Sequence, residues 1–147
     1  MATTAIWGVK DGLDSVIRYV AKSSKTWRGQ YDRAAKDHAL ENVLQYTADQ
    51  MKTEKQFYVS GLNCDEKPDA AQKQFEITKR RFKKEGGIVC FHGYQSFAPG
   101  EVTPEVAHAI GIELAKRLWG DRFEVVVATH CNTDCYHNHF AFNSVFQ

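Results

Sequence analysis

Two strand-like segments near the end of the sequence, joined by a short polar connection, constrain the fold more than any other feature. Residues 122–129, RFEVVVAT, form a nearly continuous apolar run, which is typical of a buried central strand. Residues 137–146, HNHFAFNSVF, alternate with the period of two that a strand requires. Because only a short connection, residues 131–136, separates the two segments, they can pair as antiparallel neighbours. We therefore expect a sheet that contains this pair.

The segments before this pair alternate between strands and helices. Their β-branched and aromatic content predicts strands at residues 3–9, 55–63 and 88–97. Their apolar spacing predicts helices at residues 13–22, from about residue 37, at 68–84 and at 104–119. The last helix has Thr103 as its cap. It carries one apolar stripe of the kind that packs on a core, formed by Val106, Ile110, Leu114 and Leu118.

This order of elements predicts an α+β sandwich. We expect a mostly antiparallel sheet of about five strands, with the helices packed on one face. The length of 147 residues favours one domain, and no linker interrupts residues 1–147. An apolar content of 43% is close to the globular average and allows a real core.

The first helical segment has a second copy further along the chain. Each matching residue recurs 27 positions later, and the pairs are Leu13 and Leu40, Val16 and Val43, Ile17 and Leu44, Tyr19 and Tyr46, Ala21 and Ala48, Lys25 and Lys52, Thr26 and Thr53. Two copies are too few for a solenoid, which needs at least three. We interpret the pattern as the local duplication of one helical element.

Charge and apolar patterning exclude several classes of protein. Nineteen Lys and Arg against eighteen Asp and Glu give a net charge of +1, so any basic surface for nucleic acid must be local. No apolar run approaches the ~18 residues of a membrane span, so no membrane insertion is expected. The first residues lack the pattern of a signal peptide. Four scattered cysteines without such a signal indicate reduced thiols, and a cytoplasmic protein.

Three of the six histidines, His130, His137 and His139, fall within ten residues. His137 and His139 are two residues apart, so on a strand both side chains point to the same face, within reach of one ion. His130 ends the preceding strand, and pairing of the two strands would bring it beside them. Three neutral imidazoles on a rigid strand pair leave open positions on a metal, as a catalytic site requires. Three surface histidines near a turn are the alternative.

The cysteines in the connection, Cys131 and Cys135, offer another interpretation. With His137 and His139 they could form a structural zinc site. However, the Cys-to-Cys spacing of four is at the edge of the spacing in zinc fingers, and both histidines lie on a strand. Two idle thiols agree better with the sequence.

The segment from His130 to Asn143, HCNTDCYHNHFAFN, resembles the three-histidine motif of the conjugative relaxases, the mobilisation nucleases of plasmids and integrative conjugative elements. That motif reads His-x-Asp-x-x-x-x-His-x-His, with Asn four residues later. A second signature of the family, a tyrosine on an early helix followed by Lys-Thr, is matched by both Tyr19 and Tyr46. Residues 90–104, CFHGYQSFAPGEVTP, are similar to the strand-turn segment before the family's third helix. The resemblance covers essentially the whole chain and implies the palm-like relaxase sandwich.

The resemblance implies site- and strand-specific nicking of single-stranded DNA at a transfer origin. In the family the histidines hold one divalent metal, Mg²⁺ or Mn²⁺, against the scissile phosphate, and a tyrosine hydroxyl attacks it. A tyrosine, with a pKa of ~10, is a poor nucleophile until the phosphate is polarised, which the metal does. The product is a 5′-phosphotyrosine link. Between the two tyrosines we favour Tyr46, because its copy leads through Lys52-Thr53 directly into the next strand.

The sequence departs from the family pattern at two points. The family's Asp between the first histidine and the histidine pair is Asn132 here, and Asp134 could replace it in supporting the ligands. Asn143 is expected to support the site in the same way. The chain also stops at Gln147, directly after the motif, whereas similar relaxases continue much further. We therefore expect a catalytic part truncated at its C-terminus, with uncertain activity.

DNA contacts are expected from local charge. A basic cluster at the end of the third helix is suited to phosphates, although it could be a solvated helix end; its residues are Lys79, Arg80, Arg81, Lys83 and Lys84. Lys25 and Lys52 of the repeated segments would touch the strand near the nucleophile. His92 lies in a predicted strand and could approach the site, after the three ligands in importance.

The expected partners are single-stranded DNA at a transfer origin, accessory DNA-binding proteins and a type IV secretion coupling protein. Two alternatives to the enzyme remain. One is a catalytically impaired, single-strand DNA-binding fragment of a relaxase. The other is a small zinc-stabilised interaction domain built on Cys131, Cys135, His137 and His139.

Overall fold

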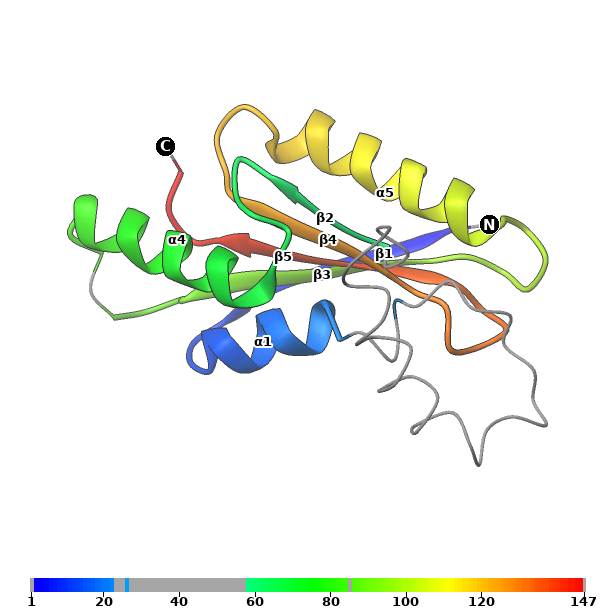
Figure 1. Cartoon of the computed structure of the whole chain (residues 1–147), viewed down its shortest axis with the longest axis horizontal. Helices are drawn as coiled ribbons and strands as arrows, with labels where there is room; N and C mark the ends of the chain where they lie inside the picture. Colours follow the sequence, from blue (N-terminus) through cyan, green and yellow to red (C-terminus); the bar gives the residue numbers. More distant parts are fainter. Residues whose placement is uncertain (1, 23–25, 27–57, 85, 147) are drawn as a thin grey trace, which may run out of the picture.

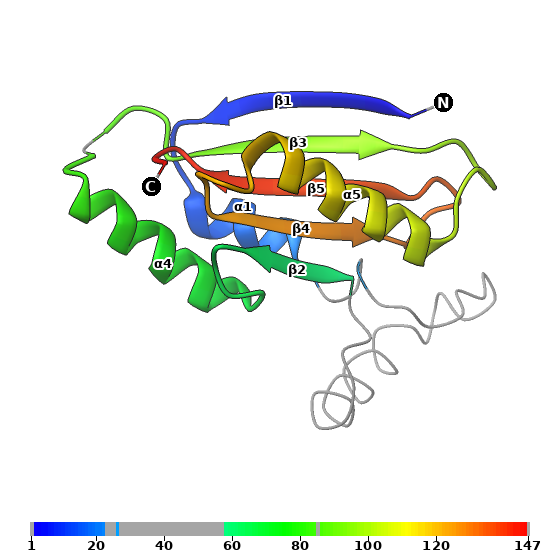
Figure 2. The same ribbon diagram turned by 90° about the horizontal axis from the view of Figure 1, so that it is seen from above.

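The computed structural model describes residues 2–22, 26, 58–84 and 86–146 and forms an open five-stranded sheet. The strands are β1 Thr3–Val9, β2 Val59–Leu62, β3 Cys90–Ser96, β4 Val125–His130 and β5 His137–Asn143. The described helices are α1 Leu13–Val20, α4 Pro68–Arg81 and α5 Pro104–Trp119. The strand order is β1-β3-β5-β4-β2, and every neighbouring pair is antiparallel (Figure 2). The predicted α+β class and antiparallel sheet are confirmed.

The last two strands form the expected antiparallel pair inside the sheet. In their register Val127 lies opposite Phe140, and His130 lies opposite His137. All six residues of β4 are buried, as the continuous apolar run predicts. The pair lies between β3 on one side and β2 on the other, so neither strand is an edge.

Helices cover both faces of the sheet, which corrects the prediction that all of them pack on one face. Figure 1 shows α1 and α4 on one side of the strands and α5 on the other. Ile17 of α1 and Phe75 of α4 pack with Ala128 and Ala141 in one core cluster. Ala115 of α5 packs with Phe140 and Phe142 in a second cluster. Because alternate residues of a strand point to opposite faces, a sheet buried on both sides needs helices on both.

Of the predicted apolar stripe of α5, Leu114 packs against the second core cluster, but most of the stripe lies outside the face that packs on the sheet. Val106 is 47% exposed and Leu118 is 56% exposed, whereas the buried residues of the helix are Ala107, Gly111 and Ala115. These small residues let the helix backbone approach a sheet face that already carries the large rings of β5. The size of the facing side chains therefore decides which side of this helix is buried. The predicted cap is confirmed, because the Thr103 hydroxyl accepts from the N–H of Val106 at 3.3 Å.

Several predicted features lie outside the described residues. They are the second copy of the repeat, with its helix from residue 37, and the start of the strand expected at 55–63. The helix expected at 68–84 ends at Arg81, and Lys83 after it has a positive φ of 54°. No helix in the part that the structure describes has both the length and the apolar character to cross a membrane.

Candidate metal centre

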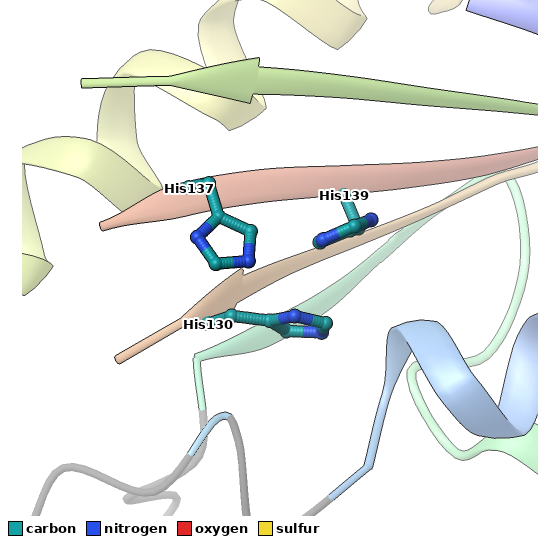
Figure 3. Close-up of side chains that lie close together, drawn as sticks. All are labelled: His130, His137 and His139. Atoms are coloured by element: carbon teal, nitrogen blue, oxygen red, sulfur yellow. The ribbon is translucent and has the colours of Figure 1, made fainter. Parts of the chain in front are cut away.

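The three histidines of the motif meet on the sheet face that carries α1. His130 is the last residue of β4 and lies opposite His137, the first residue of β5; His139 lies opposite Ala128. One ring nitrogen of each histidine comes within 4.8 Å of the others. Figure 3 shows the three rings turned toward one another from the two strands. The predicted cluster is thus formed by the strand pairing.

Two of the rings are anchored by backbone carbonyls, which fixes the nitrogen that each can offer to a ligand. His130 Nε2 lies 2.8 Å from the Val20 carbonyl oxygen at the end of α1. His137 Nδ1 lies 3.1 Å from the Cys135 carbonyl oxygen. A carbonyl only accepts, so the ring nitrogens donate. In the neutral rings the proton-free nitrogens are then Nδ1 of His130 and Nε2 of His137.

The third ring is anchored by another histidine. His139 Nδ1 lies 2.8 Å from Nε2 of His92 on β3. His92 lies opposite Ala141, two positions from His139 on the neighbouring strand, so the contact is diagonal. Burial lowers the pKa of His92. Its approach to the site was expected, but the bond to His139 was not.

The donor set fits one divalent ion. His130 and His139 are almost fully buried, at 1% and 7% exposure, and His137 is half-buried. Three neutral imidazoles leave one or more positions open to a water or an oxygen of a substrate. The cluster can therefore hold a metal whose buried side faces His130 and His139 and whose solvent-accessible side faces His137.

Tyr19 of α1 packs against the histidines. Its ring centroid lies 5.6 Å from that of His130, 5.5 Å from that of His139 and 6.1 Å from that of His92. The side chain is 43% exposed, so a solvent-borne substrate can reach it. The structure thus brings Tyr19 to the site, whereas Tyr46, which the sequence favours, lies outside the described residues.

The cysteines of the connection do not join the histidines. Within the described ranges, the group of side chains close enough to share a metal contains the three histidines alone. Cys131 donates to the Thr129 carbonyl at 3.6 Å. Burial raises the pKa of the Cys131 thiol to about 12, which disfavours the thiolate that binds zinc. These observations disfavour the structural zinc interpretation.

Two of the residues expected to support the ligands lie in the turn before β5, and the third lies at the end of that strand. Asn132 is half-buried and Asp134 is exposed in the turn before β5. Asp134 lines an open hollow beside the start of α5. Asn143 lies at the far end of β5, where it donates to Glu124 Oε2 at 2.7 Å and to the Phe75 carbonyl at 3.1 Å.

The basic cluster lies at the other end of the sheet from the histidines. Three of its residues form the last turn of α4, and two follow it; they are Lys79, Arg80, Arg81, Lys83 and Lys84. Thr78, next to the cluster, donates to Glu124 at 2.9 Å. Glu124 is six residues before His130, which corresponds to about 20 Å along a strand. Lys25 and Lys52 lie outside the described residues.

A buried polar network on the opposite sheet face holds the same two strands against α5. Thr129 and Asn138 are opposite each other, between the histidine-bearing positions, and Thr129 donates to Asn138 Oδ1 at 2.6 Å. His108 of α5 donates from Nδ1 to the Thr129 hydroxyl at 2.8 Å. Asn138 donates to the Ala107 carbonyl at 2.7 Å and to Gln95 at 3.0 Å. This network was not predicted from the sequence.

The comparisons with known proteins agree with this geometry. The chain matches the family of relaxases described as MobA/VirD2-like, nuclease domain, over residues 19–146. It is 46% identical over 86 residues to a Staphylococcus aureus protein named rlx, which covers 58% of this chain and 26% of that protein. It is 28% identical over 137 residues to the group II intron-interrupted relaxase LtrB of Lactococcus lactis, which covers 92% of this chain and 23% of LtrB.

No solved structure gives a significant match. The aligned part of the chain spans about a quarter of the length of these relatives. The family match, in contrast, extends over most of this chain, from Tyr19 in α1 through both histidine-bearing strands. The protein therefore belongs to the MobA/VirD2-like relaxase family, and residues 19–146 are its nuclease domain.

Proposed function

We propose that this chain is the catalytic part of a DNA relaxase that nicks one strand at a transfer origin and stays covalently attached to the 5′ end. The nucleophile is the hydroxyl of Tyr19. His130, His137 and His139 hold one divalent metal beside it. The packing of the Tyr19 ring against His130 and His139, at 5.6 and 5.5 Å between ring centroids, is the observation that supports this proposal most directly.

The reaction is a transesterification. The oxygen of the Tyr19 hydroxyl forms a bond to the phosphorus of the scissile phosphate and gives up its proton. The bond from phosphorus to the 3′ oxygen breaks, and that oxygen leaves and takes up a proton. No water is consumed, so the diester is conserved and the 3′ hydroxyl can later attack it to rejoin the strand.

The metal, when bound, polarises the phosphate and stabilises the charge that develops on its oxygens. The chain's own contribution is the fixed position of the imidazoles. His130 and His139 are buried, so water is excluded from one side of the metal centre. Of Mg²⁺ and Mn²⁺, we expect Mn²⁺ to bind more tightly, since Mg²⁺ prefers oxygen ligands in an octahedral shell. Because Asn132 replaces the family's Asp, the surroundings of the metal centre carry one negative charge fewer.

The basic cluster on α4 would contact DNA phosphates away from the reacting bond. Thr78, the residue before the cluster, bonds to Glu124, which lies about 20 Å along the strand from His130. The role of the cluster would be affinity, through counterion release, and not chemistry. We propose single-stranded DNA as the partner, with accessory proteins and a secretion coupling protein in the cell.

Covalent capture tests the proposal. Single strands that tile the transfer origin of the element encoding this chain, labelled at their 3′ ends, are incubated with the protein and Mn²⁺. We expect a labelled adduct that survives a denaturing gel and is abolished by EDTA. Tyr19→Phe removes only one hydroxyl and should abolish the adduct while DNA affinity is kept.

The matched control is Tyr46→Phe, which changes the corresponding residue of the second copy. It should leave the adduct in place. Loss of the adduct in Tyr46→Phe alone would move the nucleophile to that tyrosine. An adduct that persists in the double variant would refute the tyrosine mechanism. Binding of the strands without any adduct from the unmodified chain would favour the non-catalytic DNA-binding alternative.

A further inference from the structure

We propose that His92 is a positioning residue for the metal centre: it accepts a hydrogen bond from Nδ1–H of His139 and thereby keeps Nε2 of that ring free of a proton. The proposal rests on the metal centre of the proposed function. It follows from the 2.8 Å contact between His92 Nε2 and His139 Nδ1, which joins β3 to β5.

The direction of this hydrogen bond decides whether His139 can be a ligand. A neutral imidazole carries one proton, on Nδ1 or on Nε2. If His92 donated the bond, His139 would accept at Nδ1 and carry its proton on Nε2, and no nitrogen would be left for a metal. If His139 donates, its Nε2 has a free lone pair. Metal binding therefore requires His92 to be the acceptor, with its own proton on Nδ1.

His139 differs in this respect from the other two ligands. His130 and His137 donate to the backbone carbonyls of Val20 and Cys135, which can only accept. Their tautomers are thus set by groups that no side-chain substitution removes. The tautomer of His139 depends on one replaceable side chain.

The surroundings of His92 hold its ring in place. It is only 9% exposed. The Trp7 ring from β1 lies against it at 4.7 Å between centroids, and the Tyr19 ring lies at 6.1 Å. His92 therefore contacts the proposed nucleophile as well as a ligand. Such supporting partners typically contribute 10- to 100-fold to metal affinity.

The test measures metal binding by the free protein, with no DNA present. His92→Gln and His92→Asn form a matched pair: both are polar amides, but only the longer Gln can place an acceptor near the position of Nε2. We expect Asn to weaken Mn²⁺ binding about 10- to 100-fold in calorimetry, whereas Gln should keep most of the affinity. With Co²⁺ as the probe, the visible absorption bands of the Asn variant should differ from those of the wild type, whereas those of the Gln variant should resemble them.

A merely structural role would affect the two variants alike. Thermal unfolding of the metal-free variants shows whether both fold. Equal loss of affinity in Gln and Asn variants of equal stability would overturn the acceptor role. Wild-type affinity in both variants, with binding lost in His137→Ala, would overturn the role of His92 and leave the metal centre intact. Absence of metal binding by the wild-type protein would overturn both.

Discussion

Replacing Gly111 with alanine tests whether α5 packs closely against the histidine-bearing strands, on the sheet face opposite the histidines. In an ordinary helix interior, this change stabilises a protein by about 0.5–1 kcal/mol, since glycine loses more backbone entropy on folding. Here a Cβ at position 111 would lie 2.6 Å from Nδ2 and 2.8 Å from Cγ of Asn138. The contact is too close for either group to remain in place. The sign of the effect should therefore reverse.

The magnitude follows from what Asn138 must give up. Its amide donates to the Ala107 carbonyl and to Gln95, and each bond contributes about 0.5–1.5 kcal/mol. Forcing a methyl group into a packed contact costs a further ~1–3 kcal/mol. After the gain in helix propensity is subtracted, the free energy of unfolding should fall by roughly 1–5 kcal/mol.

Urea unfolding with linear extrapolation measures this change, provided that the slope m is the same in both proteins. Asn138→Ala provides the control, because it removes the amide that the new methyl group meets. The double variant should be more stable than the sum of the two single effects predicts, by about 1 kcal/mol or more. A Gly111→Ala variant as stable as the wild type, or more stable, would refute the close packing described for α5.

Three further outcomes are expected. Cys131→Ser combined with Cys135→Ser should leave folding and Mn²⁺ affinity nearly unchanged in calorimetry, whereas loss of folding would restore the structural zinc interpretation. Burial lowers the pKa of His108 from 6.5 to about 4, so the unfolded chain binds the proton first, and stability should fall between pH 6.5 and pH 4 in metal-free urea titrations. His108→Gln should make stability depend less on pH in this range, and an equally steep curve would contradict the lowered pKa of His108 as the cause. Replacing the basic residues after Thr78 with Gln should reduce the salt dependence of single-strand binding, while an unchanged slope would mean a solvated helix end.

The central strand pair could be predicted because its signals are local. A nearly continuous apolar run, a short connection and a period of two are all readable within 25 residues. The side of the sheet on which each helix lies is different, since it depends on how the chain crosses over after each strand. The buried face of α5 was also missed, because Ala107 and Gly111 carry little apolar signal and are buried for their small size.

The same distinction applies to the site. The three ligands lie within ten residues and share one face of a strand pair, so their cluster was predictable. The contact of His92 with His139 spans 47 residues, and it depends on the register between β3 and β5. The packing of Tyr19 against the histidines likewise depends on where α1 lies, which the sequence does not give. The duplicated sequence gives both tyrosines similar sequence neighbours, so the sequence pattern does not separate them.

The alternation of residues along β4 and β5 gives the polar pair Thr129 and Asn138 a consequence for folding. Each sits between residues of the histidine face, and a slip of either strand by one position would turn its side chains to the other side. The imidazole of His130 would then face α5, and the hydroxyl of Thr129 would lose its partner Asn138. A misaligned hairpin is thus penalised on both faces at once. The strand alignment in which α5 can bond to Thr129 and Asn138 is also the one that brings the metal ligands together on the opposite face. Packing of α5 therefore favours the correct register of the metal centre.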